Sequence, residues 1–292
     1  MPPATSVKTA TAIGMGAILL WATLASLAAL KGPVPPFQTT AIVFTIGGAF
    51  MVLVAALRGR AALLRPTPAS LALGIYGLFV YHALYFAALN LAPPAEASLI
   101  ASLWALLTVL FSALLPGHRL RVAHIAGALL GFAAAALLVH DKLGAGSGAE
   151  GARCGYALAL GCAFVWSSYS VASRLLATVP SDSLAAASLL TAALAALCSL
   201  LFETWIAPPD WTSWAALVGL GLGPLGAAFL LWDIGMKKGN VPLLGVLSYA
   251  AIVLSTALLV ALGFAEPAWT LAFACALMAA AAVVATRGGS AP

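Results

Sequence analysis

Apolar residues occur along this chain in ten long, continuous stretches, separated by short breaks that carry Pro, Gly or charged residues. A helix rises about 1.5 Å per residue, so roughly 20 apolar residues cross a hydrocarbon layer about 30 Å thick. Because the stretches do not alternate between apolar and polar positions, they do not fit the strands of a membrane barrel. The pattern predicts an all-α membrane protein with ten transmembrane helices, over about residues 10–31, 37–57, 69–90, 95–115, 121–140, 153–177, 183–206, 213–236, 241–262 and 268–286.

The composition supports this interpretation. Hydrophobic residues make up 63% of the 292 and charged residues only 7%, with a mean hydropathy of +1.09. A soluble protein of this length could not cover its surface with so few charges. The four cysteines all fall inside apolar stretches, and none has CxxC or metal-ligand spacing. We expect them to act as small core side chains, and the sequence predicts no metal site.

Lys and Arg are distributed unevenly over the predicted loops. With the N-terminus inside, ten of the 13 fall on the inner side and only Lys31, Lys142 and Arg153 on the outer side. Loops rich in Lys and Arg stay on the cytoplasmic side of a membrane. The asymmetry therefore predicts cytoplasmic N- and C-termini. It also accounts for the formal net charge of +5 without a nucleic-acid partner.

The two halves of the chain resemble each other at an offset of 145 residues. The informative matches are Gly and aromatic pairs, namely Gly16 with Gly161, Trp21 with Trp166, Gly74 with Gly219 and Trp104 with Tyr249. They predict a first five-helix repeat over residues 1–141, a Gly/Ser-rich linker over 142–152 and a second repeat over 153–292. Because five is odd, the second repeat must insert upside down. Inverted repeats are typical of secondary transporters, although a duplicated membrane protein can also be a scaffold without transport.

Three short motifs carry a resemblance to a known family. They are G-x4-W-A-T at residues 16–23, its copy G-x4-W-S-S at 161–168, and the run from YFAAL at 85–89 to ASLI at 97–100. They resemble the drug/metabolite transporter superfamily, and more narrowly its ten-helix exporters of the EamA type. The resemblance covers nearly the whole chain, and the aromatic residues within the spans are most similar to the aromatic amino acid exporter branch. The chain departs from the family at Ala105 and at Ala250 or Ala251, where members often carry Pro.

Polar and aromatic residues near the middle of the spans are candidates for a solute site, because such groups tend to face the bundle interior or a water-filled cavity. The third span carries Tyr81, His82 and Tyr85 on one broad helical face. We interpret His82 as a hydrogen-bond donor to a bound carboxylate or as a proton-sensitive gate. A structural hydrogen bond to a neighbouring helix is the alternative.

Trp104 and Trp166 lie deep in the fourth and sixth spans, away from the interface that Trp prefers. Tyr249 and Trp21 are their copies in the opposite repeats. With the two tyrosines of the third span, they predict a pocket for an aromatic or large apolar side chain, with simple packing as the alternative. Ser168, in the hydroxyl-rich sixth span, is a further candidate contact, unless its hydroxyl bonds within its own helix.

The eighth span contains candidates for gating or packing. Gly223 and Pro224 belong to a Gly-rich run that weakens the helix and lets other backbones approach. Asp233 lies near Lys237 and Lys238 at the predicted inner end. It predicts a helix-end salt bridge, or alternatively an inner gate or a first contact for a zwitterion.

The chain has no GxxxxGK[ST] phosphate loop and no set of residues typical of a membrane enzyme. We therefore expect no cofactor and no enzymatic activity. No carboxylate lies in mid-membrane, which favours gradient-driven movement over proton coupling through His82. The sequence predicts an alternating-access exporter of aromatic or bulky neutral amino acids and related metabolites, with a broad drug or metabolite exporter as the alternative. Its expected partners are the solute and the lipid of a bacterial inner membrane, and it is expected to be a monomer or homodimer.

Overall fold

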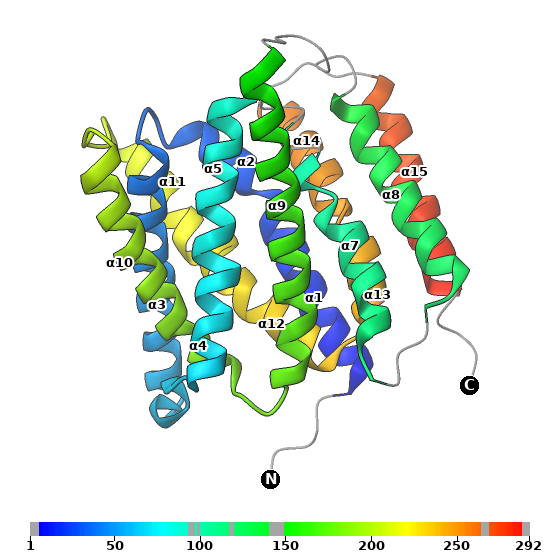
Figure 1. Ribbon diagram of the computed structural model, residues 1–292, viewed down its shortest axis with the longest axis horizontal. Helices are drawn as coiled ribbons and strands as arrows, with labels where there is room; N and C mark the ends of the chain where they lie inside the picture. The colour runs from blue at the N-terminus through cyan, green and yellow to red at the C-terminus, as the bar shows by residue number, and fades with distance from the viewer. Residues whose placement is uncertain are drawn as a thin grey trace.

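The computed structural model describes residues 6–92, 97, 100–116, 120–139, 149–263 and 269–287, and within them it is helical with no strand (Figure 1). Residues 142–148 of the predicted linker therefore lie outside the described residues, and so do Ser98 and Leu99 of the family motif. The α-helices are α1 Val7–Ala22, α2 Leu24–Leu30, α3 Pro36–Leu57, α4 Pro68–Ile75, α5 Tyr81–Leu91, α7 Trp104–Phe111, α8 Val122–Val139, α9 Ala149–Ser173, α10 Leu184–Phe202, α11 Trp211–Leu222, α12 Ala228–Lys238, α13 Val241–Leu247, α14 Ala250–Ala261 and α15 Trp269–Arg287.

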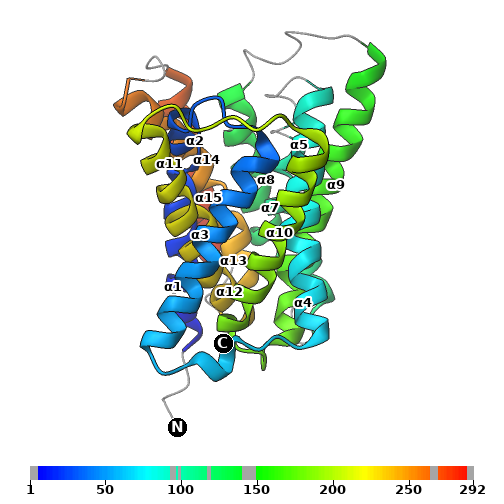
Figure 2. The ribbon, with the colours of Figure 1, turned by 90° about the vertical axis from the view of Figure 1, so that its left-hand side faces the viewer.

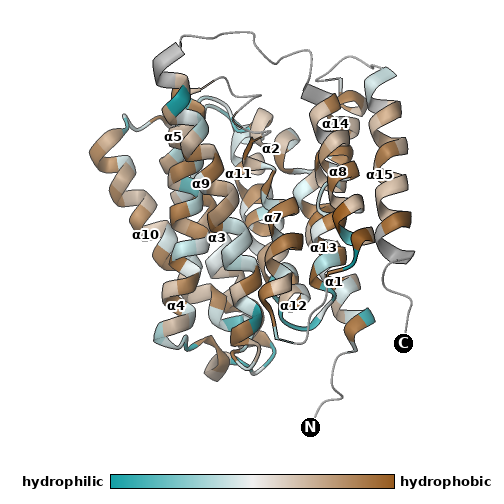
Figure 3. Ribbon diagram, turned by 45° about the vertical axis from the view of Figure 1, so that its right-hand side comes forward, coloured by the Kyte–Doolittle hydropathy of each residue, from teal (hydrophilic) through white to brown (hydrophobic). Residues whose placement is uncertain are grey.

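Among the described residues, seven helical stretches are long and apolar enough to cross a membrane, and three shorter apolar helices accompany them. The three shorter helices are Trp104–Leu114, Val122–Ala134 and Ala272–Val284, each inside a predicted span. Figure 3 shows apolar residues along the outer faces of the bundle, with the more hydrophilic segments mainly near its ends. The predicted all-helical membrane fold is thus confirmed, while the count of ten spans stays a prediction.

The largest helix contacts pair one half of the chain with the other. Helix α1 packs on α12 and α5 packs on α9, while α3 packs on α10 and α8 on α15 (Figures 1 and 2). The predicted repeat relates α1 to α9, α5 to α12, α3 to α10 and α8 to α15. Under this relation the α1–α12 pair becomes the α9–α5 pair, and the α3–α10 and α8–α15 pairs each map onto themselves, as a two-fold axis requires. Figure 1 also shows α1 and its predicted copy α9 beginning at opposite ends of the bundle. These contacts support the inverted repeat, whose residue boundaries stay a prediction.

The third and eighth spans each contain a π-helical segment, which joins α4 to α5 and α11 to α12. The segments are η2, Tyr76–Val80, and η7, Gly223–Ala227, and they overlap when one half is shifted by 145 residues. Pro224, in the Gly-rich run, explains η7, because proline has no N–H to donate to the helical hydrogen bonds. In the first, Gly77 lets the ring of Tyr169 approach so closely that an added Cβ would collide with it. A π segment widens a helix locally and is frequent at functional sites.

The fourth and ninth spans break although they have no proline at the break. Helix α7 begins at Trp104 after a turn at 102–103, and α13 and α14 are separated by a turn at 248–249. Both turns use shorter i to i+3 bonds, with the N–H of Ala105 donating to Ser102 O over 3.2 Å and that of Ala251 to Ser248 O over 3.1 Å. The Ser248 hydroxyl donates to Leu244 O at 2.7 Å, a back-bond that bends helices. The break therefore persists without proline.

The seventh span is shorter than predicted. Helix α10 ends at Phe202 rather than at residue 206, because Glu203 turns away with an extended backbone. The Glu203 carboxylate accepts from the N–H groups of Phe37 and Gln38, at 2.7 and 2.8 Å, and so caps α3. The Gln38 side chain in turn exchanges two hydrogen bonds with the backbone of Ile206. The segment after α10 is thereby fixed to the start of α3.

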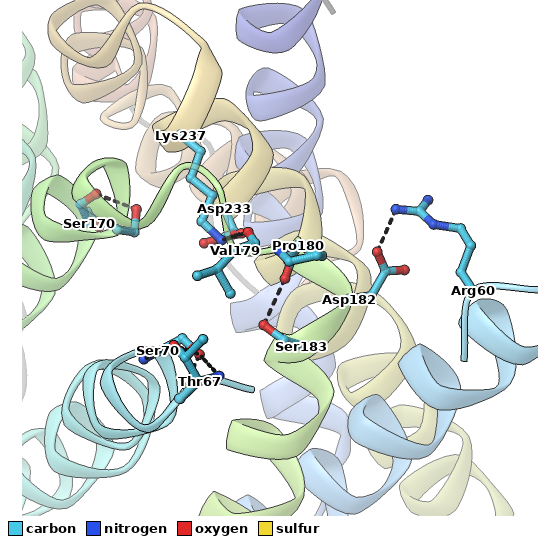
Figure 4. Close-up of polar contacts among 11 residues, drawn as sticks. Arg60, Thr67, Ser70, Ser170, Val179, Pro180, Asp182, Ser183, Asp233 and Lys237 are labelled. Carbon is cyan, nitrogen blue, oxygen red and sulfur yellow. Dashed lines mark hydrogen bonds and ion pairs between the residues drawn. The ribbon is translucent and has the colours of Figure 1, made fainter. Parts of the chain in front are cut away.

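The loops that carry most of the basic residues gather at the end of the bundle where α1 begins, which we name the basic end (Figures 1 and 2). An ion pair at this end joins Arg60 to Asp182 with N–O 2.6 Å (Figure 4). The expectation that the cysteines are core side chains holds for Cys162 only. Cys198 is half-buried, while Cys154 and Cys275 are exposed on the sides of helices.

Candidate functional site

A cavity of about 390 Å³ lies inside the bundle, between the first, third, fourth, sixth, eighth and ninth spans. This volume is within the range of roughly 300–1,000 Å³ typical of small-molecule sites. Of the eight residues predicted to bind substrate, seven line it, namely Trp21, Tyr81, His82, Tyr85, Trp104, Trp166 and Tyr249. The two helix breaks contribute Ser102 and Ser248, and the π segment of the eighth span contributes Pro224 and Leu225.

No Asp, Glu, Lys or Arg is among the described residues that line the cavity. Its walls are aromatic and aliphatic side chains with a few hydroxyls and one imidazole. A site of this kind binds a flat apolar group by contact area and orients it with a small number of hydrogen bonds. It provides no formal counter-charge for a strongly charged solute.

Three tryptophans, Trp21, Trp104 and Trp166, line the cavity, and a fourth, Trp232, packs against Trp21 and Trp104. Trp21 is at the centre, with ring centroids 6.1 Å from Trp104, 5.7 Å from Trp166 and 5.1 Å from Trp232. Trp232 is only 1% exposed and is not among the residues that line the cavity. Edge-to-face and tilted packing of this kind is favourable between aromatic rings. We name these four residues the tryptophan cluster.

Two aromatic residues of this region, Trp232 and Phe229, were not among the residues predicted from the sequence. Phe229 lines the cavity and lies 5.6 Å from Trp166 between ring centroids, stacked at 5.7 Å on Phe44. The signal was present, because Phe229, Trp232 and Met236 share one face of the eighth span at spacings of three and four. Trp232 has no aromatic copy in the other half, so the repeat does not point to it.

The indole N–H groups of the tryptophan cluster differ in their partners. That of Trp21 donates to Pro224 O at 3.0 Å, and that of Trp232 donates to the Ser170 hydroxyl at 3.0 Å. Pro224 thus accepts a bond in the cavity wall, in addition to its predicted role in packing. The N–H of Trp166 is buried without a hydrogen-bond partner. A buried donor with no partner costs about 1–3 kcal/mol.

The third span places its three predicted residues around one wall of the cavity. Tyr81 and Tyr85 are stacked, with centroids 5.9 Å apart and planes 6° from parallel. Tyr81 also lies 5.2 Å from Trp166 and 5.2 Å from His82. His82 is held by Phe44 on another face, at 5.1 Å between centroids. Its Nδ1 lies 2.6 Å from the carbonyl oxygen of Leu78 in the π segment.

Tyr249 lines the cavity from the break in the ninth span. Its ring lies against Gly131 of α8 so closely that a Cβ there would collide with it. Gly131 therefore receives an aromatic ring from the same chain. Tyr249 is fully buried.

The structure does not place Ser168 among the residues that line the cavity. Its hydroxyl donates to Phe164 O at 2.6 Å within α9 and lies 2.9 Å from the hydroxyl of Tyr76. The alternative interpretation of Ser168, a bond within its own helix, describes this geometry. Gly223 is also outside the lining and begins the π segment of the eighth span.

Buried polar contacts lie between the tryptophan cluster and the basic end. Asp233 and Lys237 form an ion pair at 2.7 Å, with side chains only 2% and 6% exposed. The Lys237 ammonium also donates to Val179 O at 2.9 Å (Figure 4). Arg174 follows α9 and donates from Nη1 to Met236 O at 3.1 Å and to Gly239 O at 2.6 Å. We name Arg174, Asp233 and Lys237 the basic-end clamp, because they attach the end of α12 to the segment after α9.

Comparisons with known proteins agree with this architecture. The chain is 54% identical over 283 residues to a protein named aromatic amino acid exporter YddG from Ancylobacter novellus, an alignment that covers 96% of this chain and 98% of that protein. A solved crystal structure superimposes with a TM-score of 0.93 at 53% identity, over 98% of this chain and all of the other. The EamA-like transporter family matches twice, over residues 8–140 and 153–287. The chain, with its two family matches and its helical bundle around a central cavity, belongs to the EamA-like transporter family.

Proposed function

We propose that this protein is an alternating-access secondary transporter that exports aromatic and bulky neutral amino acids and related metabolites across a bacterial inner membrane. The observation that carries the proposal is the uncharged cavity of about 390 Å³ with Trp21, Trp104 and Trp166 in its wall. Such walls bind an aromatic side chain by contact area and edge-to-face packing. The name of the Ancylobacter relative supports the same class of substrate.

Alternating access requires the cavity to open to one side at a time. On the side of the basic end, Trp166 and Trp232 of the tryptophan cluster and Asp233 and Lys237 of the basic-end clamp are buried, while Trp21, Trp104 and Arg174 are half-buried. In the opposite direction, the lining continues through Leu24 and Ala25 of α2 and through Ser255 and Leu259 of α14. We infer that the basic end is cytoplasmic, as the distribution of Lys and Arg predicts, and that the cavity is directed outward. N- and C-termini inside, and a monomer or homodimer, belong to this proposal.

We infer that the solute moves down its own gradient. No carboxylate is among the described lining residues, and such a group is the usual mid-membrane proton carrier. Asp233 is excluded from this role in our proposal because it is paired with Lys237 behind the tryptophan cluster. The transporter needs no cofactor and no catalytic group for this movement.

The test is exchange of labelled phenylalanine and tryptophan by the purified protein in liposomes. Exchange is expected for the wild type, and Trp104→Ala and Trp166→Ala are expected to reduce it at least tenfold, because each removes a ring worth several kcal/mol of burial and packing. Leu197→Ala is the control, since Leu197 is 52% exposed on the outer face of α10. Absence of exchange for every amino acid would contradict the substrate class.

A broad exporter of drugs or metabolites is the second candidate. The absence of charged lining residues among those described favours it, because shape and apolar surface alone would then select the solute. Cells that make the protein would be protected against chemically diverse apolar compounds, whereas an amino acid exporter would protect mainly against toxic amino acid analogues.

A further inference from the structure

The imidazole of His82 has one nitrogen whose role is set by the backbone. Nδ1 lies 2.6 Å from Leu78 O, and a carbonyl oxygen can only accept, so Nδ1 must carry a proton. The rings of Phe44, Tyr81 and Phe86 surround the imidazole, with centroids at 5.1, 5.2 and 6.2 Å. These contacts fix the plane of the ring. Nε2 is the only other polar atom of this side chain, and His82 lines the cavity.

The surroundings of His82 determine the state of Nε2. A doubly protonated imidazole would be a buried cation, which needs a counter-ion. The described residues that line the cavity include no carboxylate, and the three neighbouring rings are uncharged. The neutral tautomer with its proton on Nδ1 meets all of these conditions. Its Nε2 is then a hydrogen-bond acceptor and cannot donate to a carboxylate.

We propose that His82 binds the ammonium end of the solute, with Nε2 accepting an N–H from it, and that arylalkylamines without a carboxylate are therefore ligands of this cavity. The proposal builds on the proposed function and reverses the polarity expected from the sequence, in which His82 donates to a carboxylate. The ring of Tyr81 lies 5.2 Å from the imidazole and 5.2 Å from the ring of Trp166, and the electron-rich faces of such rings favour a nearby cation. The aryl group then lies towards the tryptophan cluster.

The opposite charge of an amino acid finds weaker partners. The cavity has no Lys or Arg among its described lining residues, so a carboxylate can receive only neutral donors such as the unpartnered N–H of Trp166. An arylalkylamine that lacks the carboxylate loses little binding free energy. An aryl acid that lacks the ammonium loses its hydrogen bond to His82. The site therefore discriminates by the N–H group of the ligand.

Ligand binding is measured on the purified wild-type protein by tryptophan fluorescence, with excitation that phenyl ligands do not absorb. Three of the four tryptophans of the cluster line the cavity, so the readout does not require transport. The ligands are L-phenylalanine, 2-phenylethylamine, the N,N,N-trimethyl derivative of each, and 3-phenylpropionate, which has no donor in place of the ammonium. We expect both primary amines to bind, and the trimethyl derivatives and phenylpropionate to bind about tenfold or more weakly, because a hydrogen bond to a charged group is lost.

Two variants separate the hydrogen bond from the size of the trimethyl group. His82→Phe keeps an aromatic ring against Phe44 and Phe86 but has no acceptor, and it should bind 2-phenylethylamine and its trimethyl derivative equally. His82→Gln supplies a carbonyl acceptor and should recover part of the preference for the primary amine. Leu197→Ala, on the outer face of α10, should retain the full preference.

Equal binding of the primary and trimethyl ligands by the wild type would overturn the proposal, as would an unchanged preference in His82→Phe. Tight binding of phenylpropionate together with no binding of 2-phenylethylamine would also overturn it, because it would make His82 a donor. Failure of the proposed export function is distinguishable, since it would leave liposome exchange of phenylalanine absent while the amines still quench the fluorescence.

Discussion

Each end of the bundle has its own polar contacts, and the contacts at the two ends connect different sets of helices. At the basic end, Arg174 and Lys237 bond α12 to the segment after α9, and Thr11 of α1 accepts from the N–H of Asn240. Helices α1, α9 and α12 all supply residues to the cavity wall. At the other end, Glu203 and Gln38 bond α3 to the segment after α10, and neither α3 nor α10 is among the described elements that line the cavity.

This difference indicates which contacts must change during transport. A solute that leaves towards the basic end has to separate helices that the basic-end clamp connects. The contacts of Glu203 and Gln38 can persist throughout the cycle, because they lie beside the cavity. The basic-end clamp is therefore expected to influence transport, and the contacts at the other end to influence stability alone.

The largest expected effect comes from breaking the buried ion pair. Asp233→Ala leaves the ammonium of Lys237, one turn further along α12, buried without its carboxylate, and removal of one partner of such a pair costs about 3–5 kcal/mol. We expect a large fall in the thermal unfolding midpoint of the purified protein. Lys238→Ala is the matched control, because Lys238 is the neighbouring lysine but is exposed.

A double variant sharpens this prediction. Asp233→Ala with Lys237→Met removes both charges and should be more stable than Asp233→Ala alone, since no unpaired charge remains. If Asp233→Ala unfolded at the temperature of the wild type, the pair would not stabilise the basic end.

The second prediction concerns Arg174, whose two bonds to the end of α12 are both made by a charged donor. Each such bond contributes about 1.5–3 kcal/mol, so Arg174→Ala should favour the state that is open at the basic end. Ser173 is 3% exposed and adjacent, and a Ser173→Cys reporter in a background without other cysteines measures this opening. Its reaction with a soluble maleimide should accelerate at least tenfold.

Two controls connect the second prediction to the comparison of the ends. Arg60→Ala removes an exposed ion pair at the same end and should leave the labelling rate of the reporter unchanged. Glu203→Ala removes the cap of α3 at the other end and should lower stability by about 0.5–2 kcal/mol without faster labelling. Faster labelling in Glu203→Ala would show that the two ends are coupled and would contradict the distinction between them.

Much of the cavity was predictable from the sequence, because its aromatic and polar residues are energetically unfavourable in contact with the middle of a lipid bilayer. Trp104, Trp166 and His82 lie at mid-span, where an aromatic or polar group is retained only if it faces other protein or a cavity. The positions of the helices followed from the length of the apolar stretches for a similar reason. Both properties depend on the lipid, which acts on each span separately.

What the sequence did not predict depends on contacts between spans. The boundary of the seventh span differed because Glu203 caps α3, about 165 residues away along the chain. The break in the ninth span needs no proline, since the Ser248 back-bond and i to i+3 bonds suffice. The polarity of His82 depends on the carbonyl of Leu78, whose position is set by a π segment that periodicity does not reveal. Such features arise only when the chain is packed.

The smallest expected effect is a titration at the end opposite the basic end. Asp210 caps α11, and the N–H of Ser213, which donates to its carboxylate at 2.7 Å, lowers the pKa of Asp210 below its ordinary value. A carboxyl whose pKa is lower in the folded state stabilises the protein above its unfolded pKa of about 4, and this contribution is lost as the pH falls through the folded pKa. The contribution of Asp210 should therefore be constant from pH 7 to about pH 5 and should decline only below about pH 4.

Asp210→Asn keeps a good capping group but does not titrate, so the difference between its unfolding midpoint and that of the wild type isolates this residue from the other carboxylates. A difference that changes instead between pH 5 and 7 would contradict the assignment, and the Ser173→Cys reporter should label equally in both proteins, because α11 is not among the described elements that line the cavity.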